Sequence, residues 1–265
     1  MGRNAAPSFQ PTGLAQRAWD RLAHTFEDDV CDIVTADRAG VIADTLDRLG
    51  AGLADRTVVD LGCGIGTFAL RFGRRFKAVY GVDFSKAMLR YAAQRCRHLP
   101  NAAWIQGDLR TVTRATVPAG DLTVCFNVIT WIQAKTRAAM LRRLFHLTNP
   151  GGTALIVVPS RESTLRAHRL AGDRRISPRA LRRLETHGIL VHDGTGQKYF
   201  AKQELAECVR QAGFSRCTVR PIWIPWSEEG LSANGSGGPR RALPWDWLAI
   251  GHKRPCQERV RRSSR

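Results

Sequence analysis

The chain of 265 residues contains no long apolar run and no recognisable sorting segment. No stretch approaches the roughly 20 apolar residues that a bilayer-spanning helix needs. The first residues, Met1–Pro7, lack the apolar core of a signal peptide, and Gly2 is not followed by Ser or Thr at position 6, as myristoylation would require. We therefore expect a soluble, cytoplasmic protein with no membrane partner.

Closely spaced cysteines are also missing. The seven cysteines are scattered, their number is odd, and no two of them form a Cys-x-x-Cys pair. Zinc ribbons and redox dithiols need such pairs, so we expect no metal and mostly reduced thiols. Cys63 and Cys125 stand where small buried side chains are expected, and Cys256, in a polar segment, is the best candidate for a reactive thiol.

Acidic residues are scarce relative to basic ones, and lysine is rare. There are 23 Asp and Glu against 41 Lys and Arg, a formal net charge of +18, and only six of the basic residues are lysine. Eight arginines lie in 161–183 and six basic residues in 253–265. Such a charge is typical of a protein that binds nucleic acid or another anion, unless it reflects an arginine-rich composition. Because no aromatic-interleaved RNA-binding motif is visible, we favour the compositional interpretation and rank nucleic acid second among partners.

What the chain does contain is a glycine-rich turn after an apolar strand, in residues 58–66, VVDLGCGIG. Asp60 is followed by Gly62, Gly64 and Gly66 at alternate positions. Glycine accepts positive φ and lets a ligand approach the backbone, and a following helix offers free N–H groups. A dinucleotide site would place its third glycine one position later. The turn therefore predicts a site for a different small polar ligand.

Two further acids end short apolar segments. Asp83 follows the segment 79–82, which places its carboxylate at the carboxyl end of the neighbouring parallel strand, where it can accept both hydroxyls of a ribose. The alternative is that Asp83 caps the helix beginning near Ser85. Asp108 ends the segment 104–107, at a spacing that fits a strand–helix–strand unit.

These motifs resemble the class I S-adenosylmethionine-dependent methyltransferases. The resemblance is carried by the glycine turn, by 81–89 (GVDFSKAML) and by 149–152 (NPGG) before a buried strand. Residues 199–214, with Ala212-Gly213-Phe214 at their end, resemble the family's last helix and the turn after it. The match covers most of 56–220. It implies S-adenosylmethionine as cofactor, S-adenosylhomocysteine as product, and an in-line displacement that needs no metal.

The resemblance also implies which residues hold the methyl donor. In the family, the acid at the position of Asp108 accepts a hydrogen bond from the adenine amino group, the N–H of Leu109 faces the ring, and the loop from Asn127 to Trp131 edges the active site. Trp131 is alternatively a core aromatic. The implied cofactor-binding residues are Asp60, Gly62, Cys63, Gly64, Gly66, Asp83, Phe84, Met88, Asp108, Leu109, Asn127, Val128 and Trp131. The Asn/Asp-Pro-Pro-Tyr/Phe motif of nucleic-acid amino-methylating enzymes is absent, which weakens that substrate class.

The expected fold is α/β: a three-layer, doubly wound, mostly parallel seven-stranded sheet with an antiparallel edge hairpin, N-terminal helices and a lid insertion. The predicted divisions are a disordered 1–13, N-terminal cap helices in 14–55, an S-adenosylmethionine-binding core in 56–159, a substrate lid in 160–198, the rest of the core sheet in 199–252 and a basic disordered tail in 253–265. Periodicity and capping predict helices at 14–30, 36–50, 162–171 and 178–187, a glycine-rich stretch at 192–196, strands at 216–224 and 242–252, and a loop at 228–240.

The expected activity is methyl transfer to an O, N or C nucleophile of a small molecule, with a secondary metabolite as the expected acceptor and a monomer or homodimer as the expected state. The alternatives are an RNA or protein methyltransferase, favoured by the charge, and a non-catalytic module that keeps the donor site.

No catalytic base is assigned from the sequence. The candidates in or beside the lid are His168, His187, His192, Glu162 and Tyr199, whereas His146 is expected on a core-facing helix. Four tryptophans near the last two strands either pack the edge hairpin against a helix or form an apolar wall for an aromatic or lipophilic substrate: Trp223, Trp226, Trp245 and Trp247.

Overall fold

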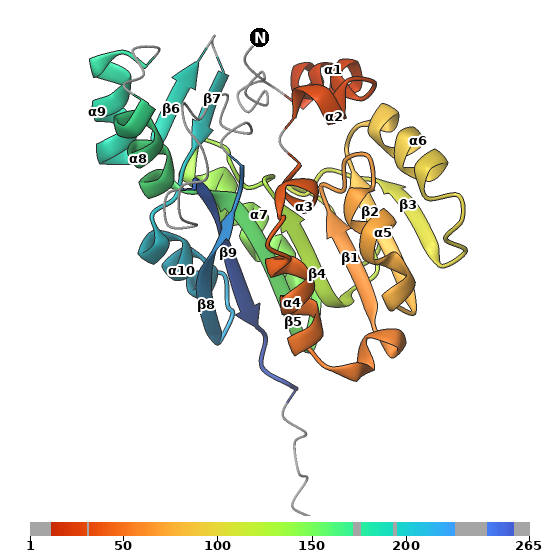
Figure 1. Ribbon diagram of the computed structural model, residues 1–265. Helices are drawn as coiled ribbons and strands as arrows, with labels where there is room; N and C mark the ends of the chain where they lie inside the picture. Colours follow the sequence, from red (N-terminus) through yellow and green to blue (C-terminus); the bar gives the residue numbers. More distant parts are fainter. Residues whose placement is uncertain (1–11, 31, 172–175, 193–194, 226–242, 257–265) are drawn as a thin grey trace, which may run out of the picture.

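A computed structural model describes residues 12–30, 32–171, 176–192, 195–225 and 243–256. Its centre is a seven-stranded sheet in the order β3-β2-β1-β4-β5-β9-β8 (Figure 1). The strands are β1 (Thr57–Leu61), β2 (Ala78–Asp83), β3 (Ala102–Gln106), β4 (Gly120–Phe126), β5 (Thr148–Pro159), β8 (Arg216–Trp223) and β9 (Trp245–His252). The first five run parallel, and β9 is antiparallel to both β5 and β8. The predicted fold, with its antiparallel edge hairpin, is confirmed.

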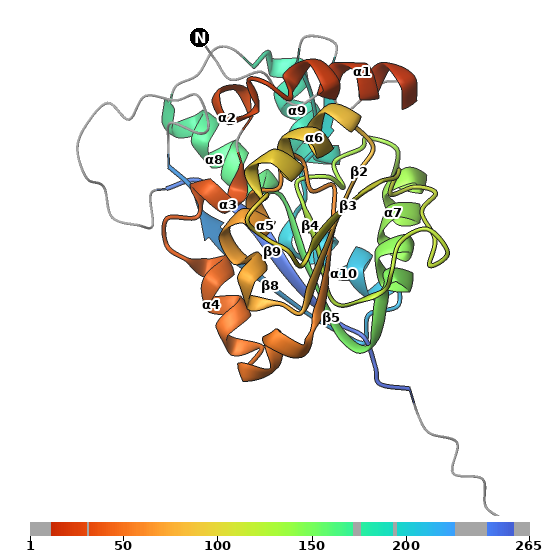
Figure 2. The same ribbon diagram turned by 90° about the vertical axis from the view of Figure 1, so that its right-hand side faces the viewer.

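Helices cover both faces of the sheet, as right-handed crossovers between parallel strands require. Seen along the sheet, α4 and α5 lie on one side and α7 and α10 on the other (Figure 2). The bounds of the helices around the sheet are α3 (Ile33–Ala36), α4 (Val41–Arg48), α5 (Thr67–Phe72), α6 (Lys86–Arg95), α7 (Ala134–Leu147) and α10 (Lys202–Gln211), with short 3-10 turns at Ala51–Asp55 and Gly73–Arg75.

A second group of elements gathers at one end of the sheet, uppermost in Figure 1. This group comprises α1 (Thr12–Leu22), α2 (Phe26–Asp29), α8 (Arg161–Ala171), α9 (Pro178–His187) and the hairpin of β6 (Ile189–His192) and β7 (Thr195–Lys198). It lies over the carboxyl ends of the five parallel strands, the edge at which ligands bind in open α/β sheets.

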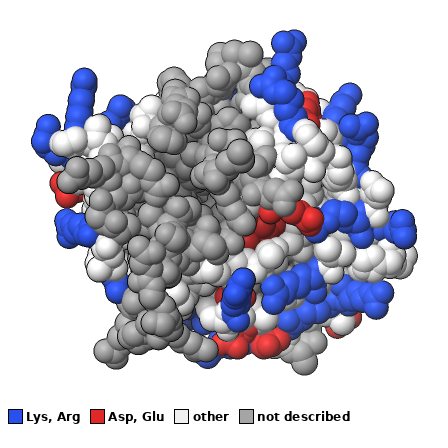
Figure 3. Space-filling model, turned by 45° about the horizontal axis from the view of Figure 1, so that its top comes forward, with Lys and Arg blue, Asp and Glu red and all other residues white. Residues whose placement is uncertain are grey.

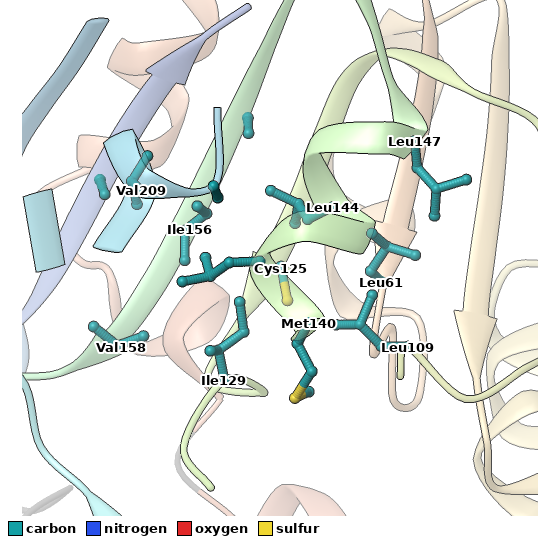
Figure 4. Packing of buried hydrophobic residues seen from close by; sticks show 14 of the residues in the cluster. Leu61, Leu109, Cys125, Ile129, Met140, Leu144, Leu147, Ile156, Val158 and Val209 are labelled. Carbon is teal, nitrogen blue, oxygen red and sulfur yellow. The ribbon is translucent and has the colours of Figure 1, made fainter. Parts of the chain in front are cut away.

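The core is split into two apolar layers by the sheet. One layer joins inward side chains of β1, β4 and β5 to α7 and α10, with Cys125, Leu144 and Ile156 all fully enclosed (Figure 4). The other joins the opposite face to α3, α4 and α5, with Val58, Phe68 and Leu155 among its members. The central parallel strands β1, β4 and β5 are therefore buried on both faces, which is why these segments are nearly continuous apolar runs in the sequence.

Several predicted boundaries change in the structure. The single helix predicted at 14–30 is broken into α1 and α2. The helix predicted at 36–50 is observed as the shorter α4, and α3 before it was not predicted. The break between α1 and α2 lets Trp19 and Phe26 pack together, with ring centroids 6.4 Å apart. The strands predicted at 216–224 and 242–252 are observed as β8 and β9, and the lid helices as α8 and α9.

Two other expectations in this part of the chain were wrong or incomplete. The glycine-rich stretch at 192–196 contributes to the β6–β7 hairpin, which the sequence did not predict. The helix that carries His146 is core-facing as expected, since Met140, Leu144 and Leu147 of α7 are buried, but His146 itself is on its exposed face. Trp226 and the loop predicted at 228–240 lie outside the described residues, as do 1–11 and 257–265 of the two predicted disordered ends. Among the described residues, no helix combines the length and the apolar character that a bilayer crossing requires.

The indole of Trp104 on β3 lies where two glycines leave room for it. A Cβ at Gly81 on β2 would overlap ring atoms of Trp104, and one at Gly66 would approach the same ring to 2.9 Å. Both glycines are therefore required for this ring to pack against the start of α5 and the middle of β2.

We predict that Gly81→Ala lowers the free energy of unfolding by about 1–3 kcal/mol, because the added methyl group overpacks a closed contact with Trp104. Urea-induced unfolding measures the change. Gly52→Ala is the matched control, since no atom lies within 4 Å of its added Cβ. Equal midpoints for the two variants would contradict the account of the Trp104 contact.

Candidate functional site

The glycine turn lies at the carboxyl edge of the sheet, between β1 and α5. Gly62, Gly64 and Gly66 have φ values of 80°, 52° and 77°, a region that L side chains rarely adopt. The backbone N–H groups of Gly62 and Cys63 donate to the carbonyl of Val82 at 2.7 and 3.0 Å, which closes the turn against β2. The sequence prediction that these glycines form a bare-backbone turn is borne out by these dihedrals.

The carboxylate of Asp83 fixes this turn from the end of β2. Its Oδ2 accepts a hydrogen bond from the N–H of Gly64 at 3.0 Å, and its Oδ1 accepts one from the N–H of Ser85 at 2.9 Å. The cap of α6 is Ser85, whose hydroxyl accepts from the N–H of Met88, so Asp83 is not the capping residue. Each oxygen of Asp83 keeps a lone pair for a ligand, and its role as ribose acceptor stays a prediction.

Asp60 is the least compensated acid of the site. It is only 4% exposed, and no hydrogen-bond donor among the described residues reaches its carboxylate. Burial, together with the nearby negative charges of Asp83 and Asp32, raises its pKa to about 8. Burial also raises the pKa of Asp83 to about 6, against the hydrogen bonds from Ser85 and Gly64. A cationic ligand beside these two groups would relieve the cost of ionising them.

The carboxylate of Asp108, which is predicted to bind adenine, is already hydrogen-bonded to a neighbouring arginine. Both of its oxygens accept from the Nε of Arg110, at 2.9 and 3.0 Å, and Oδ2 also accepts from Nη2 at 2.5 Å. Burial opposes its ionisation, but the hydrogen bonds from Arg110 outweigh this and lower its pKa. The same guanidinium lies over the ring of Trp131, 4.9 Å from its centroid. Leu109 is buried in the core beside them.

Asn127 stands directly after β4 in an unusual conformation. Its φ is 56°, the one positive value for a residue other than glycine among the described residues. Its backbone N–H donates to the carbonyl of Val157 at 2.8 Å, and its side-chain Nδ2 donates to Oδ2 of Asp246 at 3.1 Å. Its Oδ1 is buried and has no hydrogen-bond partner. The side chain of the next residue, Val128, fills the space where a Cβ of Gly62 would lie.

The N-terminal helices are bonded to the start of α6, beside the end of β2. Asp20 of α1 accepts from the hydroxyl of Ser85 at 2.5 Å and from the N–H of Ala87 at 3.2 Å. Met88 packs in a small apolar cluster with Trp19 and Leu22 of α1. Sequence reasoning missed Asp20, although it is the one acid in residues 14–26 of the helix predicted at 14–30.

The elements that follow β5, beginning with α8, are bonded to the other end of this edge, at β9 and α10. Glu162 of α8 accepts from the indole Nε1 of Trp247 at 3.2 Å and from the N–H of Lys202 at 3.1 Å. Ser163 accepts from the backbone N–H of Trp245 at 2.7 Å. These bonds pin α8 to β9 and α10, which commits Glu162 to a structural contact.

A buried ion pair closes the base of the hairpin. The ammonium of Lys198, whose side chain is 4% exposed, lies 2.6 Å from Oε1 of Glu204 and donates to the carbonyl of His187 at 2.8 Å. Burial lowers the pKa of Lys198, and its bond with Glu204 opposes that shift. The backbone N–H of Lys198 donates to the carbonyl of Thr130 at 2.8 Å. The lid is thereby tied to the loop that carries Asn127.

The remaining candidates from the sequence divide by location. His187 is exposed at the end of α9, and Tyr199 is half-buried after β7. His168 on α8 has a buried Nδ1 without a hydrogen-bond partner, and the side chain of His192 lies outside the described part of the structure. Trp223, Trp245 and Trp247 form a row with centroid separations of 5.3 and 5.8 Å, and the bonds of Trp245 and Trp247 to α8 favour the packing interpretation.

Asp246 is a site residue that the sequence interpretation did not identify. It is 6% exposed on β9, paired with Pro159 of β5, at the same edge as Asn127. Burial raises its pKa to about 7, against the hydrogen bonds from Asn127 and from the backbone of Ser160. The sequence does contain a signal that could have identified Asp246, because it is an acid inside the otherwise apolar run WDWLAI. In the described part of the chain, no three His, Cys, Asp or Glu side chains gather so as to hold a metal ion.

A family model described as "Methyltransferase domain" matches residues 58–152. This range contains the glycine turn, Asp83, Asp108 and Asn127. The methyltransferase family predicted from the sequence is therefore confirmed for this domain, residues 58–152.

Curated relatives carry the same domain. The chain is 38% identical over 108 residues to the 2-phytyl-1,4-naphtoquinone methyltransferase of Thermosynechococcus vestitus, covering 38% of this chain and 45% of the relative. It is 31% identical over 108 residues to the ubiquinone biosynthesis O-methyltransferase of Serratia proteamaculans, covering 40% and 44%. The alignments thus span less than half of the length of these relatives.

Solved methyltransferases share the fold over nearly the whole chain. The magnesium protoporphyrin IX methyltransferase of Synechocystis, solved with bound S-adenosylhomocysteine, superposes with a TM-score of 0.58 at 15% identity. The match covers 91% of this chain and 99% of that one. The helices over the carboxyl edge therefore belong to an architecture found in methyltransferases of similar length.

We predict that the stability of this protein falls as pH rises from about 4 to about 8, in part through Asp60. Its folded pKa of about 8 lies above the ordinary value of 3.8, so the stabilisation is fully present below about pH 4 and is lost as the pH passes about 8. Asp60→Asn should flatten this decline and raise the free energy of unfolding at pH 8 by at least about 1.4 kcal/mol, the equivalent of one pKa unit. Urea titrations at several pH values measure both effects. The same slope in the variant and the parent would contradict the assignment.

Proposed function

We propose that this methyltransferase transfers a methyl group from S-adenosylmethionine to a small-molecule acceptor. The observation that carries the proposal is the closed glycine turn held by Asp83, with the unpaired carboxylate of Asp60 buried beneath it. Bare backbone, a ribose-accepting acid and an uncompensated negative charge fit a nucleoside that carries positive charge.

The residues divide along the edge in the order of their strands. The turn from Gly62 to Gly66 and Asp60 would face the amino-acid part of the donor, and Asp83 would accept the ribose hydroxyls. Asp108 and Leu109 would face the adenine, with Arg110 holding the Asp108 carboxylate in place through its side-chain hydrogen bonds. Asn127, Val128 and Trp131 would border the reacting group. Phe84 and Met88 support the donor site from the turn and first turn of α6.

The donor supplies an electrophilic methyl group on a positively charged sulfur. The protein's part is to bind and orient the two reactants and to exclude water. The N-terminal helices, fastened through Asp20, and the lid, fastened through Glu162 and Lys198, cover the edge from two sides and serve this purpose.

A small-molecule acceptor is favoured over RNA or protein. One relative is named for a 2-phytyl-1,4-naphtoquinone and another for ubiquinone biosynthesis, and the solved neighbour is named for magnesium protoporphyrin IX, all of them small molecules. On the face over the carboxyl edge, basic side chains are spread around the rim and interspersed with acidic ones (Figure 3). A cytoplasmic location and a monomeric or homodimeric state stay expectations.

We predict that S-adenosylhomocysteine binds at a single site and that Asp83→Asn weakens this binding tenfold to a hundredfold. The amide keeps one acceptor but cannot accept at both positions now bonded to Gly64 and Ser85, which also disturbs the turn. Isothermal titration calorimetry measures the change. Asp121→Asn is the control, because Asp121 lies at the opposite end of β4.

The competing function is tested on the same protein. A 20-nucleotide RNA should show no binding that survives a rise from 50 to 200 mM salt, and no methyl label from labelled donor. Absence of S-adenosylhomocysteine binding by the parent protein would refute the proposal, and methyl label on the RNA would replace it with the second function.

A further inference from the structure

The side of the edge where the methylated molecule would bind contains hydrogen-bonding groups that binding of S-adenosylmethionine does not explain. Among the described residues, four buried side-chain atoms lack a hydrogen-bond partner, and three of them are Oδ1 of Asn127, Nε1 of Trp245 and Nδ1 of His168. Asn127 is bonded to Asp246 of β9, whereas the indole of Trp245 packs on the opposite face of the sheet, because successive side chains of a strand alternate between the two faces. The unsatisfied atom beside Asp246 is therefore Oδ1 of Asn127.

Asp246 is placed beyond the donor, on the acceptor side. The strand order puts β1 and its glycine turn on one side of β4 and puts β5 and β9 on the other. Because neighbouring strands lie about 4.8 Å apart, β9 is about 10 Å from β4. The 3.1 Å bond from Nδ2 of Asn127 to Oδ2 of Asp246 bridges that interval across the end of β5.

The bond with Asn127 also determines what this place can recognise. The side-chain Nδ2 of Asn127 donates its hydrogen bond to Asp246, so the carbonyl Oδ1 of Asn127 is the atom left without a partner. Asp246 offers only acceptor oxygens when ionised. No Lys or Arg side chain among the described residues forms an ion pair with Asp246. Two acceptor groups side by side favour a ligand atom that carries a proton, and they disfavour an anion.

Resting on the proposed function, we propose that the acceptor is a neutral protic nucleophile, an O–H or an N–H group, and that Asp246, oriented by Asn127, receives its proton. A lone pair of the acceptor oxygen or nitrogen forms the bond to the methyl carbon, and the carbon–sulfur bond breaks with its electron pair left on sulfur. The proton moves to the Asp246 carboxylate and then to water. A carboxylate that accepts the methyl group needs no base and carries a negative charge. The Asp246 carboxylate therefore excludes it.

The chain provides a matched control for Asp246. Asp121 at the start of β4 is also bonded to an asparagine, since its Oδ1 accepts from Nδ2 of Asn149 at 2.9 Å, and its Oδ2 accepts from the N–H of Thr57. This second Asp–Asn pair lies at the amino end of the sheet, away from the proposed site. Asp246→Asn and Asp121→Asn therefore make the same chemical change at opposite edges.

The experiment uses the full chain saturated with S-adenosylhomocysteine and three probes of similar size: phenol, aniline and benzoate. Ligand-observed NMR titrations give their affinities. We expect phenol and aniline to bind at least tenfold more tightly than benzoate. In Asp246→Asn this discrimination should fall at least fivefold, because the repulsion of benzoate is removed, whereas Asp121→Asn should match the parent.

Methyl transfer from labelled S-adenosylmethionine to phenol is the second measurement. It should fall at least a hundredfold in Asp246→Asn, the range expected for loss of a general base, and by less than threefold in Asp121→Asn. Affinity for S-adenosylhomocysteine should stay within threefold of the parent in both variants, which shows that each is folded with its donor site intact.

Three results would overturn the inference: benzoate bound as tightly as phenol, the same discrimination and rate in Asp246→Asn as in the parent, or no transfer to phenol by the parent. If the parent protein fails to bind S-adenosylhomocysteine, the proposed function itself fails. Donor binding together with any of the three results refutes only the role of Asp246.

Discussion

The hydrogen bond between the Asp83 carboxylate and the N–H of Gly64 is the constraint on which the rest of the edge depends. It joins the turn after β1 to the end of β2, and the Val82 carbonyl adds two bonds from the turn to the same strand. Because Asp83 also holds Ser85, one side chain positions both the glycine turn and the start of α6. Asp20 reaches that same helix start, so the N-terminal helices are placed relative to the turn through a chain of three polar contacts.

Electrostatics along the edge differ from those of the protein as a whole. The chain carries a formal net charge of +18, yet Asp60, Asp83 and Asp246 are buried and burial raises the pKa of all three. Asp108 differs, because Arg110 neutralises it. The edge thus has a neutralised end near β3 and an uncompensated end near β1, β4 and β9. S-adenosylmethionine has an uncharged adenine and a positively charged sulfur. The adenine would lie at the end where Arg110 neutralises Asp108, and the sulfur would lie near the uncompensated acids.

The parts that could be predicted from the sequence are those determined by neighbouring residues. The central parallel strands are apolar runs, and the turn needs its glycines within five positions. Asp83 ends β2, and Asp108 lies two residues after the end of β3. Chain direction and right-handed crossovers then place these acids at one edge without further information.

The parts that were missed depend on contacts between distant residues. Asn127 and Asp246 are 119 positions apart, and Asp20 meets Ser85 across 65. The β6–β7 hairpin has strands of four residues, too short to show an alternation against the glycines around 194–196. The break between α1 and α2 occurs without proline or glycine, since packing of Trp19 and Phe26 on one cluster decides it. The contact of Arg110 with Asp108, two positions away, was also missed, although it is local.

The attachment of the lid has a mechanical consequence. The N–H of Lys198 holds the carbonyl of Thr130, and a Cβ at Gly196 would approach the side chain of Ile132 to 3.0 Å. The hairpin and the loop after β4 are therefore joined by contacts at two points, and the Lys198–Glu204 pair attaches the hairpin to α10. A molecule that displaced the hairpin would strain the bond to Thr130, three residues after Asn127, so entry of a ligand from this side would be coupled to the position of Asn127 at the end of β4.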